Sequence, residues 1–212
     1  TAQKRWLDGS AVDTTNIDTT VAQLTKDSNF TEIEKDLLTA TQKFFEYYPN
    51  EPEVAEILLL EATLYYNRSH YAQAIQLFEN LLAQKPRPSN FQEVTKLLAL
   101  AHMARKDFKS AEKSYSLLAA TAIDAGYILL GEKGKVEAGY RGAEALEAKG
   151  KFAEAAQEYI EVALRNRNAD LADISYFAGA EAWEKAKNFK KAAQTYLDLN
   201  KEFPSSNFAD GA

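Results

Sequence analysis

The chain has 212 residues, 46% of them hydrophobic and 26% charged, so it can build a core and lacks the composition of a disordered protein. Its 25 Lys and Arg against 31 Asp and Glu give a net charge of -6, which argues against nucleic acid and anionic membrane surfaces as partners. There is no cysteine, which excludes a disulfide framework, and no apolar run approaches the roughly 20 residues that span a bilayer, so direct membrane insertion is not expected.

The first 49 residues are predicted to hold a flexible tail at 1–17 and helices over 18–49. The tail is rich in Thr, Asp, Gly and Ser, which is typical of a terminus or linker. Thr31 followed three positions later by Glu34 is a capping signature, because the two side chains can satisfy the first free amides of a helix. Asn90 with Glu93 offers a similar helix start further along the chain.

From residue 51 onward, amphipathic helical segments come in pairs separated by short polar turns. Apolar residues recur at i, i+3 or i+4, and i+7, which is the period of a helix with one buried face. Turn residues that interrupt this period indicate antiparallel helix pairs. The pattern predicts helical hairpins at about 51–86, 90–122, 134–165 and 170–204, and the start of a further helix at 205–212.

One signature recurs in these hairpins: a small residue, an aromatic residue, a polar turn, a second aromatic residue, Ala and a third aromatic residue. The first copy is Ala62, Tyr65, Tyr71, Ala74, Phe78 and Pro86, and the last is Ala180, Trp183, Phe189, Ala192, Tyr196 and Pro204. Alanine at a helix crossing lets the two axes approach closely. A signature repeated at this period predicts stacked helical units.

The spacing of the repeats is broken once. The alanines after the turns, at positions 74, 111, 155 and 192, lie 37, 44 and 37 residues apart. The longer interval places seven extra residues in the region 121–135, which carries apolar residues at 127–130. Two interpretations are open: the second helix of the preceding hairpin is extended and packs on the next hairpin, or a partner-binding loop protrudes.

These units resemble tetratricopeptide repeats. Residues 55–86 and 173–204 follow that pattern closely, and the middle units depart from it at His102, Ile123 and Gly139. The resemblance covers about residues 50–208 and implies an all-α fold, a right-handed α-solenoid of stacked antiparallel helix hairpins that forms one superhelix over 18–212. It is specific for the fold and unspecific for the function.

The resemblance also implies a partner-binding groove, because in this family the first helix of each hairpin lines a concave surface. The implied groove residues are Leu59, Thr63, Tyr66, Lys96, Leu100, Met103, Tyr140, Glu144, Glu147, Phe177, Glu181 and Glu184. Such a groove is apolar and aromatic at one end and acidic at the other. It suits an extended or helical peptide with apolar anchors and basic residues.

The function implied is a non-enzymatic scaffold that holds a protein or peptide partner, alone, as an oligomer or in a larger complex. The alternative is an architectural segment of a longer repeat protein whose groove is filled intramolecularly. No catalytic residue or cofactor site is predicted, because the sequence has no nucleophile elbow and no dinucleotide fingerprint. No metal site is predicted, because the two histidines, His70 and His102, have no carboxylates at ligand spacing. His102 occupies a position that is aromatic or apolar in other units, so we expect a packed core imidazole.

Two short sequence motifs bear on the cellular location of the protein. Residues 44–49 and 199–204 are similar to the "F..YP" endings of bacterial cell-envelope members of the family, which include outer-membrane-assembly lipoproteins and Tol-Pal-associated periplasmic proteins. The similarity implies a periplasmic or cell-envelope location, and without it a cytoplasmic location would fit equally well. Residues 204–209 repeat the helix-opening pattern of 88–92, so we expect the natural polypeptide to continue beyond Ala212.

Overall fold

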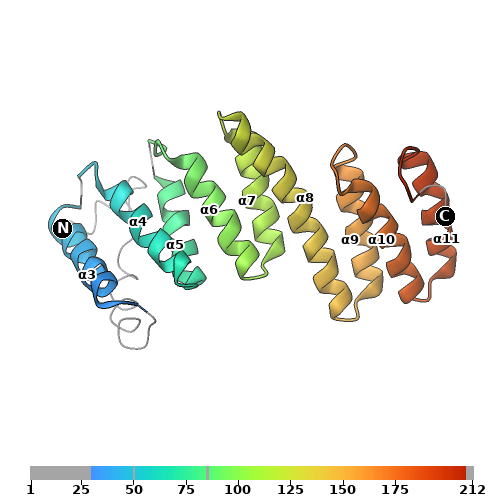
Figure 1. The fold of residues 1–212 in the computed structure, drawn as a ribbon, viewed down its shortest axis with the longest axis horizontal. Coiled ribbons are helices and arrows are strands. Elements are labelled where there is room, and N and C mark those ends of the chain that lie inside the picture. Colours follow the sequence, from blue (N-terminus) through green and yellow to red (C-terminus); the bar gives the residue numbers. More distant parts are fainter. Residues whose placement is uncertain (1–29, 50, 85, 209–212) are drawn as a thin grey trace. The chain divides into compact units, whose positions relative to one another are not determined.

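The computed structural model describes residues 30–49, 51–84 and 86–208, and every regular element in these ranges is an α-helix (Figure 1). The chain divides into two compact units, Thr1–Arg105 and Lys106–Ala212. Within each unit, helices that follow one another in the sequence pack side by side. The all-α helical-repeat fold expected from the sequence is thereby confirmed. The tail predicted at 1–17 and the helical stretch before residue 30 lie outside the described residues.

Unit 1 contains α3 (Glu32–Tyr47), α4 (Val54–Asn67), α5 (Tyr71–Ala83) and α6 (Phe91–Ala104). The alanines and aromatic residues of the repeat signature form its core, because they lie where α4 and α5 face each other. Core residues with less than 2% exposure include Leu58, Ala62, Tyr65, Ala74, Phe78 and Leu81.

The capping signature at Thr31 is confirmed. The Thr31 hydroxyl accepts a hydrogen bond from the Glu34 amide at 3.3 Å, and the Glu34 carboxylate accepts one from the Thr31 amide at 2.7 Å. Asn90 stands at the N-cap of α6 as predicted, but its side chain caps nothing. Its backbone (φ -88, ψ 17) is not in the extended conformation that directs a cap side chain toward the first turn.

Unit 2 contains α7 (Phe108–Thr121), α8 (Ala125–Ala148), α9 (Phe152–Arg165), α10 (Ala172–Lys185) and α11 (Phe189–Glu202). One part of its core lies among α8, α9, α10 and α11 and includes Ala143, Ala155, Tyr159, Trp183 and Ala192. The last residues described, Pro204–Phe208, form turns, and the rest of the helix predicted at 205–212 lies outside the described residues.

The extra residues form the beginning of α8, which corrects both interpretations of the region 121–135. The preceding helix is not extended, because α7 ends at Thr121, and no long loop protrudes, because α8 begins at Ala125. The predicted hairpin start at 134 is therefore nine residues too late. Asp124 caps the new helix by accepting hydrogen bonds from the amides of Gly126 and Tyr127 at 2.8 and 3.3 Å.

Helix α8 packs against two neighbouring helices, α7 and α9 (Figure 1). Glycines permit its close approach to both. A Cβ atom on Gly131 would lie 2.5 Å from the amide nitrogen of Ala119 in α7, so only glycine permits the observed approach. In the second half of α8, a Cβ atom on Gly139 would lie 2.6 Å from Val162 of α9. Helix α8 thus packs on α7 along its length, and its second half also packs on α9.

Candidate functional site

The predicted groove residues fall into two sets, one in each unit. In unit 1, six side chains lie half-buried on α4 and α6: Leu59, Thr63, Tyr66, Lys96, Leu100 and Met103. Leu59 and Tyr66 pack against the core, and the Tyr66 ring lies 5.6 Å from that of Tyr71. Burial, with a smaller contribution from Tyr71, raises the pKa of Tyr66 above its ordinary value.

In unit 2, the predicted residues lie on two helices, α8 and α10, and together we call them the α8–α10 face. Its members are Tyr140, Glu144, Glu147, Phe177, Glu181 and Glu184. Burial is the main cause that raises the pKa of Tyr140, and the carboxylates of Glu144, Glu147 and Glu181 raise it further. Acids from two different helices therefore surround one half-buried phenol.

The protein's own bases neutralise part of this acidic face. Glu147 accepts a hydrogen bond from the Lys185 ammonium at 2.5 Å and another from the Tyr159 hydroxyl at 3.3 Å. The bond to Glu147 is the largest cause that raises the pKa of Lys185. Glu144 pairs with Arg141 at 3.0 Å.

The remaining two acids, Glu181 and Glu184, are exposed and form no ion pair within the described ranges. Sequence reasoning missed both basic neighbours of this face. The Arg141–Glu144 pair could have been found from its i,i+3 spacing. Lys185, in contrast, lies four positions after Glu181 but pairs with Glu147, 38 positions away.

Phe177, which we call the aromatic end of the α8–α10 face, is covered by the chain itself. The Phe177 ring stacks on Phe208 with centroids 4.8 Å apart and lies 5.5 Å from the Tyr196 ring. The Ser206 hydroxyl donates a hydrogen bond to the Asp173 carboxylate at 2.7 Å and accepts one from the Phe208 amide. The segment Pro204–Phe208 is thus held on α10, and Phe177 is not an open anchor point.

Metal-ligating clusters and membrane-spanning helices are absent from the described part of the chain. It contains no group of three or more His, Cys, Asp or Glu side chains that could hold a metal ion. His102 is only 8% exposed, as expected for a core imidazole, and His70 stacks on Phe30 at 5.1 Å. None of the helices in these ranges is long and apolar enough to cross a membrane.

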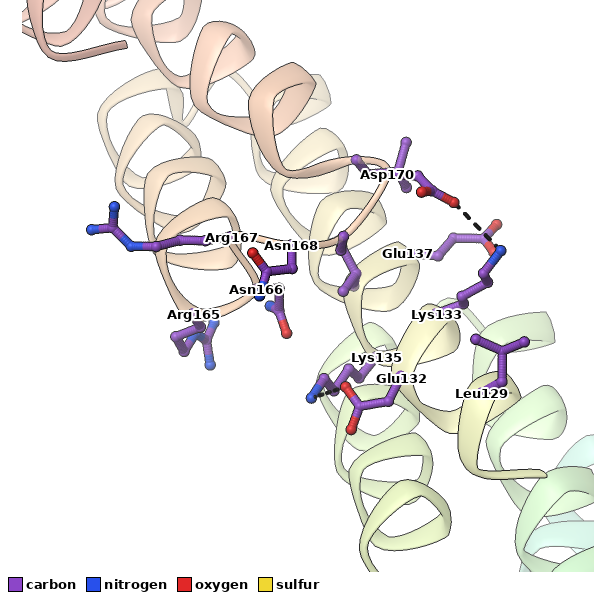
Figure 2. A pocket seen from close by; sticks show the side chains of 13 residues that line it. Leu129, Glu132, Lys133, Lys135, Glu137, Arg165, Asn166, Arg167, Asn168 and Asp170 are labelled. Carbon is purple, nitrogen blue, oxygen red and sulfur yellow. Dashed lines mark ion pairs between the residues drawn. The ribbon is translucent and has the colours of Figure 1, made fainter. Parts of the chain in front are cut away.

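A pocket of about 600 Å³ lies elsewhere in unit 2, where sequence reasoning predicted no site. One wall consists of α8 residues between Leu129 and Glu137, and the other is the run 165–171 at the end of α9 and before α10. Figure 2 shows two ion pairs among the residues that line this opening. Lys133 reaches across to Asp170 at 3.4 Å, and Lys135 pairs with Glu132 on α8 at 2.5 Å. The irregular repeat spacing was the one sequence signal for this site.

Comparison with known proteins bears on the fold. A family model described as Tetratricopeptide repeat matches residues 59–127 and 140–207, which is more than half of the chain. The gap between the two matched segments falls within the lengthened helix α8. A comparison with curated proteins gave no match.

Proposed function

Because the chain belongs to the tetratricopeptide repeat family, we propose that it is a non-enzymatic scaffold that binds a protein or peptide partner on the α8–α10 face. Tetratricopeptide repeats generally mediate protein–protein interaction, and stacked helical repeats provide extended surfaces for it. The observation that carries the proposal is the gathering of Glu144, Glu147 and Glu181 around the half-buried Tyr140.

The chemistry of this face favours a partner with a basic side chain beside an apolar one. Glu181 and Glu184 are exposed acids without an ion pair among the described residues, so a Lys or Arg of the partner can pair with them without displacing an internal base. Tyr140 and Tyr196 are half-buried rings close to these acids. An aromatic face beside carboxylates suits a cation, through both charge attraction and the ring quadrupole.

The test is affinity capture from the source organism with three proteins in parallel. They are the parent, a double variant that carries Glu181→Lys and Glu184→Lys, and a control double variant that carries Glu79→Lys and Glu161→Lys. The control reverses two exposed acids that lie outside the α8–α10 face. We expect one partner to be retained by the parent and the control and lost on the Glu181 and Glu184 variant. With the purified partner, the variant's association rate should fall roughly tenfold at low salt, and added salt should weaken parent binding. Equal association rates for all three proteins would mean that the partner does not bind through the acids of the α8–α10 face.

A second candidate function is supported by the stacking of Phe208 on Phe177. In this alternative the chain is an architectural segment whose groove is filled from within the polypeptide. The segment Pro204–Phe208 already covers one end of the α8–α10 face, as intramolecular filling requires.

A bacterial cell-envelope location is also part of the proposal. Its support is the sequence at 44–49 and 199–204, where the two motifs similar to those of cell-envelope family members occur. Cell fractionation of the native protein tests it directly. Recovery with the cytoplasmic fraction would refute this part of the proposal and leave the scaffold function intact.

A further inference from the structure

Two side chains of α10 hold the segment Pro204–Phe208, and together they form what we call the Asp173–Phe177 slot. Asp173 accepts a hydrogen bond from the Ser206 hydroxyl at 2.7 Å. One turn further along α10, the Phe177 ring stacks on the Phe208 ring with an interplanar angle of 26°. The residue between these two contacts is exposed. The slot therefore recognises two features of its occupant, which are a hydroxyl group and an aromatic ring two positions later.

A short turn in the segment fixes the spacing of these two features. The Ser206 hydroxyl accepts a hydrogen bond from the Phe208 amide at 3.1 Å while it donates to Asp173. Ser and Thr hydroxyls both form turns of this kind with an amide two residues on. Either residue can therefore present the ring to Phe177 while its hydroxyl binds Asp173.

The order of the two contacts shows that the segment runs in the same direction as α10. The next turns of this helix carry Glu181 and Glu184, which follow Phe177 by four and seven residues and so lie on the same side. A helix rises about 1.5 Å per residue and an extended chain about 3.3 Å. The two acids therefore lie beside the positions roughly two to three residues after the aromatic residue of the occupant.

Tyr196 of α11 connects the slot to these acids. Its ring lies 5.5 Å from the Phe177 ring. Burial is the main cause that raises the pKa of Tyr196, and the carboxylates of Glu184 and Glu181 raise it further. Both acids are exposed. The slot is thus continuous with the acidic part of the α8–α10 face.

The chain's own segment matches only part of this surface. Residues 209–211 are Ala, Asp and Gly, so the positions after Phe208 supply no base for Glu181 and Glu184. Attachment to α11 gives the segment a high effective concentration, which excludes ligands that match the slot only in part. A ligand that adds a base to the hydroxyl and the ring gains a contact that the segment lacks, so it can displace the segment.

We propose that the Asp173–Phe177 slot is the docking subsite for a partner segment that carries Ser or Thr, then any residue, then an aromatic residue, and Lys or Arg two or three positions later. The partner displaces Pro204–Phe208 and places its hydroxyl on Asp173 and its ring on Phe177. Its base pairs with Glu181 or Glu184. This inference rests on the proposed function, because it names the partner segment that the α8–α10 face takes.

The test is the binding of a labelled synthetic peptide to the full chain, measured by fluorescence anisotropy. The peptide has the sequence of residues 204–209 followed by two lysines, which places bases two and three positions after its phenylalanine. Three control peptides each change one feature: the serine at the position of Ser206 to alanine, the phenylalanine to alanine, or both lysines to aspartate. The protein is used as the parent, as Phe208→Ala, which removes the internal ring, and as Phe189→Ala, which removes a 68% exposed ring from α11.

We expect the lysine peptide to bind the parent, and we expect Phe208→Ala to raise its affinity roughly two- to tenfold, because the competing ring pair is gone. Phe189→Ala should leave the affinity unchanged. Each control peptide should bind about fivefold or more weakly than the lysine peptide.

The inference is overturned if Phe208→Ala does not raise the affinity, or if the serine and the phenylalanine of the peptide can be replaced without loss. Binding that depends only on the lysines and on Glu181 and Glu184 would overturn the slot and leave the proposed function intact. Absence of binding by every peptide would also overturn this inference, whereas the proposed function is decided separately by the affinity capture described above.

Discussion

At the scale of single residues, Glu34 connects the start of α3 to the turn between α4 and α5. Its carboxylate accepts the Thr31 amide and also receives two nitrogens of Arg68, with Nη2 at 2.7 Å from Oε2 and Nε at 2.9 Å from Oε1. Arg68 directly follows α4. One side chain therefore caps a helix and holds that helix against its neighbour.

Acid should release this connection. The Thr31 backbone amide, followed by Arg68, holds the pKa of Glu34 below its ordinary value of 4.5. A carboxyl group whose pKa is lowered by folding stabilises the protein above its unfolded-state pKa, and this stabilisation is lost as pH falls through the lower, folded-state value. We expect Glu34→Gln to lower the urea midpoint at pH 7, and the gap to the parent to shrink below pH 4.5.

The matched control is Glu32→Gln, which removes an acid from the same first turn of α3. Glu32 is 84% exposed and pairs only with Lys35 among the described residues. Its removal should change the urea midpoint little at any pH. If Glu34→Gln and the parent differ by the same amount at pH 7 and at pH 3, Glu34 does not act through its charge.

At the scale of elements, α8 depends on glycines for its position rather than for flexibility. A Cβ atom on Gly134 would fall against the Tyr115 ring, 2.5 Å from Cε1, and Tyr115 is only 5% exposed. The ring has no free space to move into, so α7 and α8 would have to separate. Gly142 lies in the same helix, but a Cβ atom there would meet only Phe108 at 3.5 Å, which is an ordinary contact.

These two glycines should respond to the same substitution with opposite signs. Gly134→Ala should lower stability by about 1 to 3 kcal/mol, the usual cost of overpacking, even though alanine favours helix formation. Gly142→Ala should raise stability by about 0.5 to 1 kcal/mol, because only the helix preference changes. Urea unfolding of both variants measures this. An increase for both would mean that α7 and α8 are not in close contact.

At the scale of the whole molecule, the sequence predicted the core positions that recur in each repeat and missed the features that occur only once. Ala62 and Ala74 could be placed in the core because the repeat signature marks the close helix crossing at several places. The start of α8 could not, because Gly126, Gly131 and Gly134 normally indicate a helix boundary, whereas here two of them permit close packing. The pairing of Lys185 with Glu147 depends on how α8 and α10 pack, which no local spacing reports.

The contact between Phe208 and Phe177 also depends on packing that local spacing does not report. This contact bears on both candidate functions. If the segment Pro204–Phe208 closes the aromatic end of the α8–α10 face, a partner must displace it. An aromatic pair contributes about 0.5 to 1.5 kcal/mol beyond its buried area, so loss of the ring pairing alone would weaken partner binding by roughly two- to tenfold. The burial of the Phe208 ring and the hydrogen bond from Ser206 to Asp173 add to this cost.

The chain contains no cysteine, so a single Phe177→Cys substitution reports access to this position without interference from other thiols. We expect a thiol reagent to modify Cys at this position several-fold faster when Phe208→Ala is added, because the ring that covers it is gone. Phe189→Ala is the control, since Phe189 is an aromatic residue of α11 that is 68% exposed and makes no ring contact with Phe177 in the described ranges. Equal rates with and without Phe208 would mean that the remaining contacts of the segment, such as Ser206 with Asp173, do not hold it over position 177 once the Phe177 ring is removed.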